Sequence, residues 1–213
     1  DGDRHLDLLV GTDCFGFQVQ CAVGESGLRL YRQDAGGLFT EVTSAAGLHE
    51  DMGTFGTFQH RAGLAAADFD GDGDLDVYTG IWDSAMPETR GAASGSAESR
   101  LYRNDGGVFT DVTAATGLSL PGFVGVWQPV WIDLDRDARP DLLLSVDFGP
   151  NRLYRNNGLG GFAEIAVASG FGFAATDLGL DGGNDMGLAP GDVDNDGDLD
   201  FYATNIWNYN HPG

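Results

Sequence analysis

Five aspartates fall within one stretch of nine residues: Asp68-Phe69-Asp70-Gly71-Asp72-Gly73-Asp74-Leu75-Asp76. At neutral pH, carboxylates this close together repel one another unless a cation neutralises them. Oxygen ligands at alternate positions of a tight loop, with a glycine at position 6, are the way a short loop wraps Ca²⁺. The stretch, called loop 2 below, therefore predicts a calcium site.

The expected ligands of loop 2 are four carboxylates at positions 1, 3, 5 and 9 and a backbone carbonyl at position 7, namely Asp68, Asp70, Asp72, Asp76 and the carbonyl of Asp74. An EF-hand would need flanking helices and a glutamate at position 12, where this chain has Thr79. The residues from Leu75 to Tyr78 alternate in polarity instead, as in a strand. We therefore expect a strand–loop–strand site.

The same pattern returns along the chain. Loop 3 has the expected ligands Asp133, Asp135, Asp137, Arg139 (carbonyl) and Asp141; loop 4 has Asp192, Asp194, Asp196, Asp198 (carbonyl) and Asp200. The chain opens inside a truncated copy, loop 1, in which Asp1, Asp3, His5 and Asp7 occupy positions 3, 5, 7 and 9. Loop 3 starts 65 residues after loop 2, and loop 4 starts 59 residues after loop 3. Such a period indicates a repeat architecture with three complete Ca²⁺ sites and one truncated site.

Each interval between loops also contains a hairpin signal. A Leu-Tyr-Arg segment followed by a glycine-bearing turn and a second apolar segment begins at Leu30, Leu101 and Leu153. One strand into the loop, one strand out and two hairpin arms make a four-stranded propeller blade. The chain is thus expected to be all-β, a single partial β-propeller of about three blades, with approximate repeats at 1–67, 68–132, 133–191 and 192–213.

These repeats resemble the FG-GAP/VCBS repeats of integrin-α-like β-propellers. The run from Leu101 to Thr113 together with loop 2 is most similar to the secreted type that includes cartilage acidic protein and the ASPIC/UnbV proteins. The resemblance implies a calcium-stabilised propeller that is secreted, extracellular or periplasmic, with a presentation or cell-adhesion role. The blades expected here are too few to close a ring, so we expect the chain to belong to a longer protein, whose further blades would be partners.

The net charge of the chain excludes one class of function. The chain carries 33 acidic and 11 basic residues, a net charge of −22. Nucleic-acid binding needs clustered Lys and Arg, so this class is excluded. No run of 18 apolar residues exists, so no membrane insertion is expected. Cys14 and Cys21 lie in one expected insertion; either a disulfide or two free thiols fits, and extracellular calcium chemistry favours the disulfide.

Two functions remain open. The first is a non-enzymatic binding scaffold that presents insertions at 13–29, 49–62 and 83–99 to a protein or glycan partner. The second is a calcium-dependent carbohydrate-active lyase or hydrolase, with Trp82, His49, His60 or Arg90 as candidate active groups. Trp82 and Trp207 hold like positions and serve either ligand stacking or blade packing. No nucleophile elbow, P-loop or HExxH zinc motif supports catalysis.

Loop 3 departs from the pattern. Ala138 replaces the turn glycine, and Arg139 stands at position 7. A non-glycine residue costs about 1 kcal/mol where φ is positive, and a guanidinium competes with the cation. We expect loop 3 to bind Ca²⁺ most weakly of the three complete loops.

Overall fold

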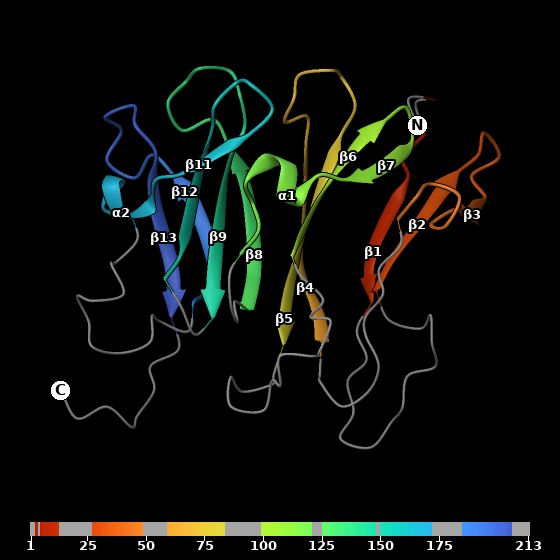
Figure 1. The fold of residues 1–213 in the computed structure, drawn as a ribbon, viewed down its shortest axis with the longest axis horizontal. Coiled ribbons are helices and arrows are strands. Elements are labelled where there is room, and N and C mark those ends of the chain that lie inside the picture. Colours follow the sequence, from red (N-terminus) through yellow and green to blue (C-terminus); the bar gives the residue numbers. More distant parts are fainter. Residues whose placement is uncertain are drawn as a thin grey trace.

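The computed structural model describes most of the chain, namely residues 3, 5–12, 27–48, 59–83, 99–120, 125–147, 150–171 and 185–205. In these residues thirteen strands form four antiparallel sheets, here called blades 1 to 4 in chain order. The sheets stand side by side in the order of the sequence, and the aspartate loops lie along one common edge (Figure 1). The prediction of an all-β fold built from propeller blades is confirmed.

Blades 2 and 3 each have four strands in the expected order. Blade 2 contains β4 (Gln59–Ala67), β5 (Asp76–Asp83), β6 (Arg100–Asp105) and β7 (Val108–Asp111); blade 3 contains β8 (Gly125–Ile132), β9 (Asp141–Asp147), β10 (Arg152–Asn156) and β11 (Phe162–Glu164). In both, the first two strands flank the aspartate loop and the last two form the hairpin. This is the strand order that the repeats predict.

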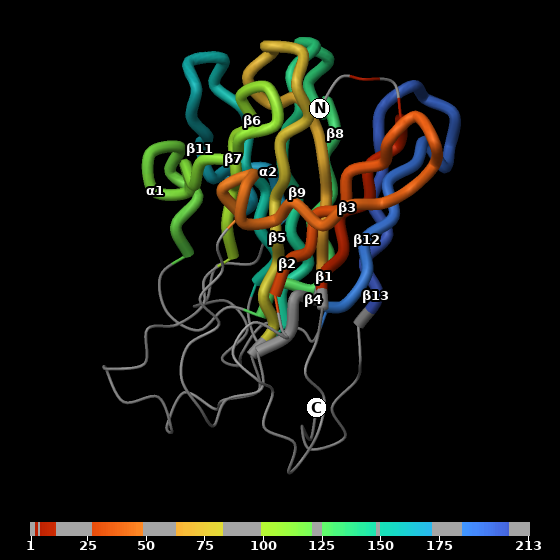
Figure 2. Tube along the Cα trace, turned by 90° about the vertical axis from the view of Figure 1, so that its right-hand side faces the viewer, coloured from red at the N-terminus to blue at the C-terminus, as the bar shows by residue number. Residues whose placement is uncertain are grey.

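The outer blades contain fewer strands in the described part of the chain. Blade 1 contains β1 (Leu8–Thr12), β2 (Gly27–Gln33) and β3 (Phe39–Glu41); blade 4 contains β12 (Asp185–Gly191) and β13 (Asp200–Asn205). Strand β1 follows the truncated loop, so it corresponds to β5. The view turned by 90° shows the successive sheets stacked behind one another (Figure 2).

The hydrophobic core lies between consecutive blades. One cluster joins Leu101 of blade 2 to Leu142 and Leu144 of blade 3, and a second joins Leu143 to Leu188 of blade 4. Every residue of β9 is buried, so the strand has a core on each face. A strand covered on both faces is expected to read as a continuous apolar run, and residues 142–144 do so.

A β-bulge recurs in the first strand of blades 2, 3 and 4. The pairing register slips by one residue at positions 62, 127 and 186, each six residues before the first aspartate of its loop. A bulge turns a side chain away from its usual face. The ring of Trp127 accordingly lies against Trp82 of the preceding blade, with centroids 5.4 Å apart.

Two features differ from the sequence expectations. One-turn helices α1 (Thr113–Thr116) and α2 (Ala166–Ser169) follow the hairpins. Each ends at a glycine in the left-handed region, Gly117 or Gly170. Strands also extend into the expected insertions, since β2 begins at Gly27, β4 begins at Gln59 and β5 ends at Asp83.

Several predictions fall on residues outside the described part of the chain. They concern Cys14 and Cys21, His49, Arg90, Trp207 and Asp1. The ends of β1 and β5, which flank two of the expected insertions, lie at the edge opposite the aspartate loops (Figure 1). No helix in the described residues is long and apolar enough to cross a membrane.

Candidate metal centres

Loops 2, 3 and 4 each bring three carboxylates together. The aspartates at positions 1, 3 and 9 offer oxygens that all lie within 4.8 Å of one another, in the triads Asp68/Asp70/Asp76, Asp133/Asp135/Asp141 and Asp192/Asp194/Asp200. The donors are all oxygens, the ligand type that Ca²⁺ and other hard cations prefer. The donor set therefore fits a calcium ion in each loop.

The aspartate at position 1 organises each loop through backbone hydrogen bonds. In loop 2, Asp68 Oδ2 accepts the N–H of Gly73 at 3.0 Å and Oδ1 accepts the N–H of Asp72 at 3.1 Å. The equivalent bonds form in loop 3 to Asp133 and in loop 4 to Asp192. The turn around each triad is thus shaped by the protein itself.

The aspartate at position 9 connects the loop to the rest of its blade. Asp76 is completely buried, and it accepts the N–H of Phe69 and the N–H of Asn104, both at 2.9 Å. Asp141 makes the same two contacts in loop 3, with Leu134 at 3.0 Å and Asn156 at 2.8 Å. A carboxylate oxygen has two lone pairs, so these bonds leave capacity for a cation.

Position 5 lies outside the triads. Its carboxylate accepts the N–H of the residue at position 7, as in Asp72 with Asp74 at 2.9 Å and Asp196 with Asp198 at 2.8 Å. Loop 1 shows the same bond from His5 to Asp3 at 2.8 Å. There the N–H of Gln33 also reaches Asp7 at 3.0 Å, as Asn104 reaches Asp76. Ligation by positions 5 and 7 stays a prediction.

Positions 4 and 6 of each complete loop adopt left-handed backbone conformations. Loop 2 has glycine at both, Gly71 with φ 79° and Gly73 with φ 96°. Loop 3 has Arg136 with φ 60° and Ala138 with φ 64°, and loop 4 has Asn195 and Gly197. The sequence reasoning foresaw position 6 and missed position 4. Gly71 and Asn195, two residue types that tolerate this region, were the available signal.

Burial and mutual repulsion disfavour the ionised form of the loop carboxylates. Burial, with smaller contributions from Asp70 and Asp72, raises the pKa of Asp76 from 3.8 to about 6. Burial also raises the pKa of Asp141, and burial followed by the charge of Asp72 raises the pKa of Asp70. A divalent cation would reverse this balance because it favours the charged form.

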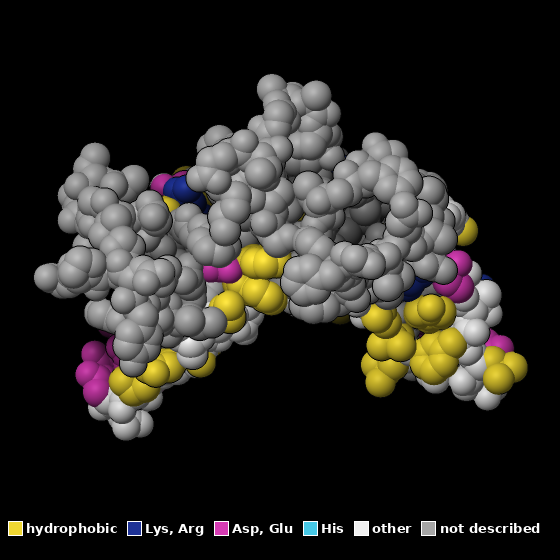
Figure 3. Space-filling model, turned by 90° about the horizontal axis from the view of Figure 1, so that it is seen from below, with side chains coloured by type: hydrophobic (Ala, Val, Ile, Leu, Met, Phe, Trp, Pro, Cys, Tyr) yellow, Lys and Arg dark blue, Asp and Glu magenta, His cyan; other side chains and the backbone are white. Residues whose placement is uncertain are grey.

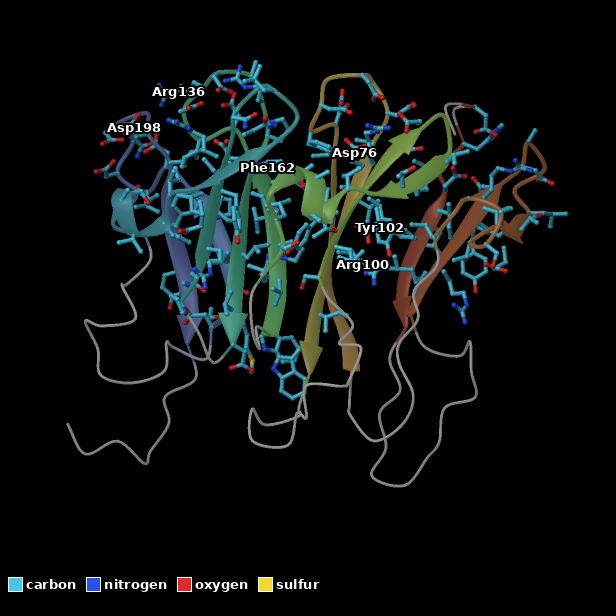
Figure 4. The ribbon with its side chains drawn as sticks, viewed as in Figure 1. Asp76, Arg100, Tyr102, Arg136, Phe162 and Asp198 are labelled. Atoms are coloured by element: carbon cyan, nitrogen blue, oxygen red, sulfur yellow. The ribbon has the colours of Figure 1, made fainter. Side chains whose placement is uncertain are left out.

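Two arginines place positive charge at loops 3 and 4. The guanidinium of Arg139 hydrogen-bonds to Asp137 within loop 3. That of Arg136 crosses from loop 3 to Asp198 of loop 4, with an Nη2 to Oδ1 distance of 3.0 Å (Figure 4). Loop 2 contains no arginine of its own, and the positive charge that acts on its Asp70 comes from Arg103 on β6.

A comparison with protein families identifies these repeats. The model for the FG-GAP-like repeat matches residues 1–79, 91–144 and 139–203, which is nearly the whole chain. The chain belongs to the FG-GAP-like repeat family. The three matched segments of this family include all the triads described above. Membership of the narrower cartilage acidic protein type stays a prediction. No curated protein shows a significant sequence match to the chain.

Within this FG-GAP-like chain, Trp82 takes part in packing between blades. Its ring contacts Trp127, and its indole N–H donates to the buried Asp147 of blade 3. The described atoms of Trp82 thus support the packing interpretation over that of ligand stacking. The enzymatic candidate His60 lies on β4, and the other two, His49 and Arg90, lie outside the described residues.

Proposed function

We propose that this FG-GAP-like chain is a calcium-stabilised, non-enzymatic binding scaffold of an extracellular or periplasmic protein with an adhesion role. The observation that carries the proposal is the repetition of one carboxylate triad at the same place in three successive blades. Bound Ca²⁺ supplies positive charge to each triad, and the protein supplies the loop shape through the position-1 aspartate. Calcium at extracellular, millimolar levels is sufficient for loops of modest affinity.

We infer that the two edges of the blades have different tasks. The triads occupy one edge, and the strand ends that lead into the insertions occupy the other (Figure 1). Seen from the latter edge, the described surface shows groups of hydrophobic side chains with acidic side chains beside them (Figure 3). A protein or glycan partner would therefore be recognised away from the calcium loops, whose role is to hold each pair of strands in register.

Thermal melting tests the structural role of the metal. Added Ca²⁺ should raise the melting temperature of the chain, because a ligand that binds the folded state stabilises it, and a chelator should reverse the rise. Asp70→Ala should remove one bound Ca²⁺ and leave the other loops occupied. Asp105→Ala, an exposed aspartate paired with Arg103, is the matched control and should leave calcium binding unchanged. A melting temperature that responds to neither calcium nor chelator contradicts the proposal.

A separate experiment addresses the partner. The calcium-loaded chain is applied to a glycan array and to extracellular protein fractions, and the bound glycans are then assayed for cleavage products. Retention without cleavage supports the scaffold. Calcium-dependent cleavage of a glycosidic bond would instead establish the enzymatic alternative.

A further inference from the structure

Asn156 connects the calcium loops of two neighbouring blades. It lies at the end of β10 in blade 3 and is 2% exposed. Its backbone N–H donates to Asp141 Oδ1, the position-9 carboxylate of its own loop 3, at 2.8 Å. Its side-chain amide donates to the carbonyl of Phe69 in loop 2, at 2.8 Å. One residue therefore contacts both loops directly.

Phe69 completes the connection on the side of blade 2. Its backbone N–H donates to Asp76 Oδ2 of the loop 2 triad, and its backbone carbonyl accepts the side-chain amide of Asn156. The ring of Phe69 is 4% exposed and packs on Phe162 of blade 3, with centroids 5.8 Å apart. Position 2 of loop 2 is thus anchored in the next blade by both its backbone and its side chain.

The equivalent residue in blade 2 provides a natural comparison. Asn104 makes the same contacts within its own blade: its N–H donates to Asp76, its amide donates to Leu75, and its side-chain oxygen accepts the N–H of Gly107. The side-chain amide of Asn156 thus bonds to the loop of the preceding blade, whereas that of Asn104 bonds to Leu75 of its own blade.

We propose that Asn156 is a positioning residue that makes calcium binding by loops 2 and 3 cooperative. This inference rests on the proposed calcium function. A cation held by the loop 2 triad fixes Asp76, and Asp76 fixes the peptide of Phe69. Ordering of that carbonyl orders Asn156, which in turn holds Asp141 in the loop 3 triad. Binding of a second cation to loop 3 then costs less conformational entropy, because the loop is already ordered. By thermodynamic linkage, binding at loop 3 favours binding at loop 2 to the same extent.

The test is a thermodynamic cycle read by calorimetry of Ca²⁺ binding to the full chain. Every protein in the cycle carries Asp194→Ala, which weakens Ca²⁺ binding by loop 4. The single-site binding constant of loop 2 is measured in the Asp135→Ala protein, and that of loop 3 in the Asp70→Ala protein. The two-site constant is measured with neither change. The coupling factor is the two-site binding constant divided by the product of the two single-site constants. We expect a factor of about five or more, falling to about one in Asn156→Ala.

Asn104→Ala is the matched control. It should weaken Ca²⁺ binding by loop 2, because the backbone N–H that Asp76 accepts loses the two side-chain bonds that hold residue 104 in place, while the coupling factor is retained. Calcium binding at both loops with a factor of one in the native chain overturns the inference and leaves the proposed function standing. Retention of coupling in Asn156→Ala also overturns it. Absence of calcium binding at every loop overturns both proposals.

Hydrogen exchange gives a second readout that does not depend on folding of the Asn156 variant. In the Asp135→Ala protein, binding of calcium to loop 2 should slow hydrogen exchange of the backbone N–H of Asn156 in blade 3 by about fivefold. An exchange rate at Asn156 that calcium leaves unchanged, while the amides of residues 71–73 become protected, contradicts the coupling.

Discussion

The indole nitrogen of Trp82 on β5 lies 2.5 Å from Oδ2 of Asp147 on β9, across the boundary between blades 2 and 3. Asp147 is 2% exposed, and the same oxygen accepts the indole N–H of Trp127 at 3.2 Å. A buried carboxylate is costly unless donors surround it. The two tryptophans therefore satisfy Oδ2 of this carboxylate, whereas Oδ1 is buried without a hydrogen bond in the described structure.

Trp82→Phe should destabilise the chain more than Trp131→Phe. Both changes shrink an aromatic side chain, but the indole nitrogen of Trp131 is buried and makes no hydrogen bond in the described structure. The difference should be about 1–3 kcal/mol in the free energy of unfolding, the cost of removing a donor from a buried acceptor. Urea denaturation at saturating calcium measures it. Equal losses in the two variants would show that the Asp147 contact contributes little.

Gly63→Ala should weaken the packing of blade 2 against blade 3. A Cβ at this position would lie 2.3 Å from the carbonyl oxygen of Trp127 and 2.3 Å from Cδ of Pro129. Backbone has to move to relieve such a contact, at a typical cost of about 1–3 kcal/mol. Gly191→Ala is the control, because a Cβ added there, at the end of β12, would have no atom within 4 Å. A Gly63 variant as stable as the Gly191 variant would refute this close approach.

Ala138→Gly should stabilise the chain and tighten loop 3. Ala138 has a φ of 64°, a conformation that costs a non-glycine residue about 1 kcal/mol. The reciprocal change, Gly73→Ala in loop 2 with φ 96°, should destabilise by a similar amount, since its Cβ would meet no neighbouring atom. Calorimetry of calcium binding and thermal melting check both directions. Shifts of the same sign in the two variants would contradict the argument.

Arg139→Gln should raise the calcium affinity of loop 3. The guanidinium of Arg139 now binds Asp137 and adds positive charge beside the triad. A neutral side chain of similar length removes that charge while keeping most of the volume. Calorimetric titration should show loop 3 filling last in the native chain and at lower calcium in the variant. Occupation of loop 3 before loops 2 and 4 in the native chain would disprove the expected order of affinity.

The calcium-free chain should lose stability as the pH rises from about 4 to about 6. Burial raises the pKa of Asp76 to about 6 in the folded state, above its ordinary value of 3.8. Within this window the folded state therefore binds a proton that the unfolded state releases, so deprotonation favours unfolding by roughly 2 kcal/mol. Denaturation of calcium-stripped protein across the window tests this. Asp76→Asn should remove that part of the pH dependence, and an unchanged slope in the variant would exclude Asp76 as its source.

The sequence was most informative where chemistry and spacing coincide. The alternation of aspartates from Asp68 to Asp76 predicted both the loop and its flanking strands, and the recurrence at Asp133 and Asp192 predicted the blades. Residues 30, 101 and 153 correctly marked the strands of the hairpins. These signals are local, so a single sequence carries them in full.

Other features depend on contacts that a local pattern does not contain. The bulge at residue 127 is visible only as a slip between β8 and β9. Asn104 and Asn156 look like ordinary turn residues until the fold brings them to Asp76 and Asp141. The helices α1 and α2 are single turns, too short for a helical period to appear in the sequence. The bulge and the two asparagines depend on residues that are distant in the sequence. The helices are too short for their hydrophobic period to be recognised.

The carboxylate triads and the strand ends that flank the expected insertions lie at opposite edges of the blades, so the two can vary independently. Strands β1 and β5 end, and β2 begins, on the side away from the carboxylate triads (Figure 1). Doubling the length of a flexible connection costs only about 0.6 kcal/mol in closure entropy. A connection that joins these strand ends can therefore change in length at small cost while the carboxylate triads at the opposite edge keep their geometry, so recognition could diversify without a change in the framework.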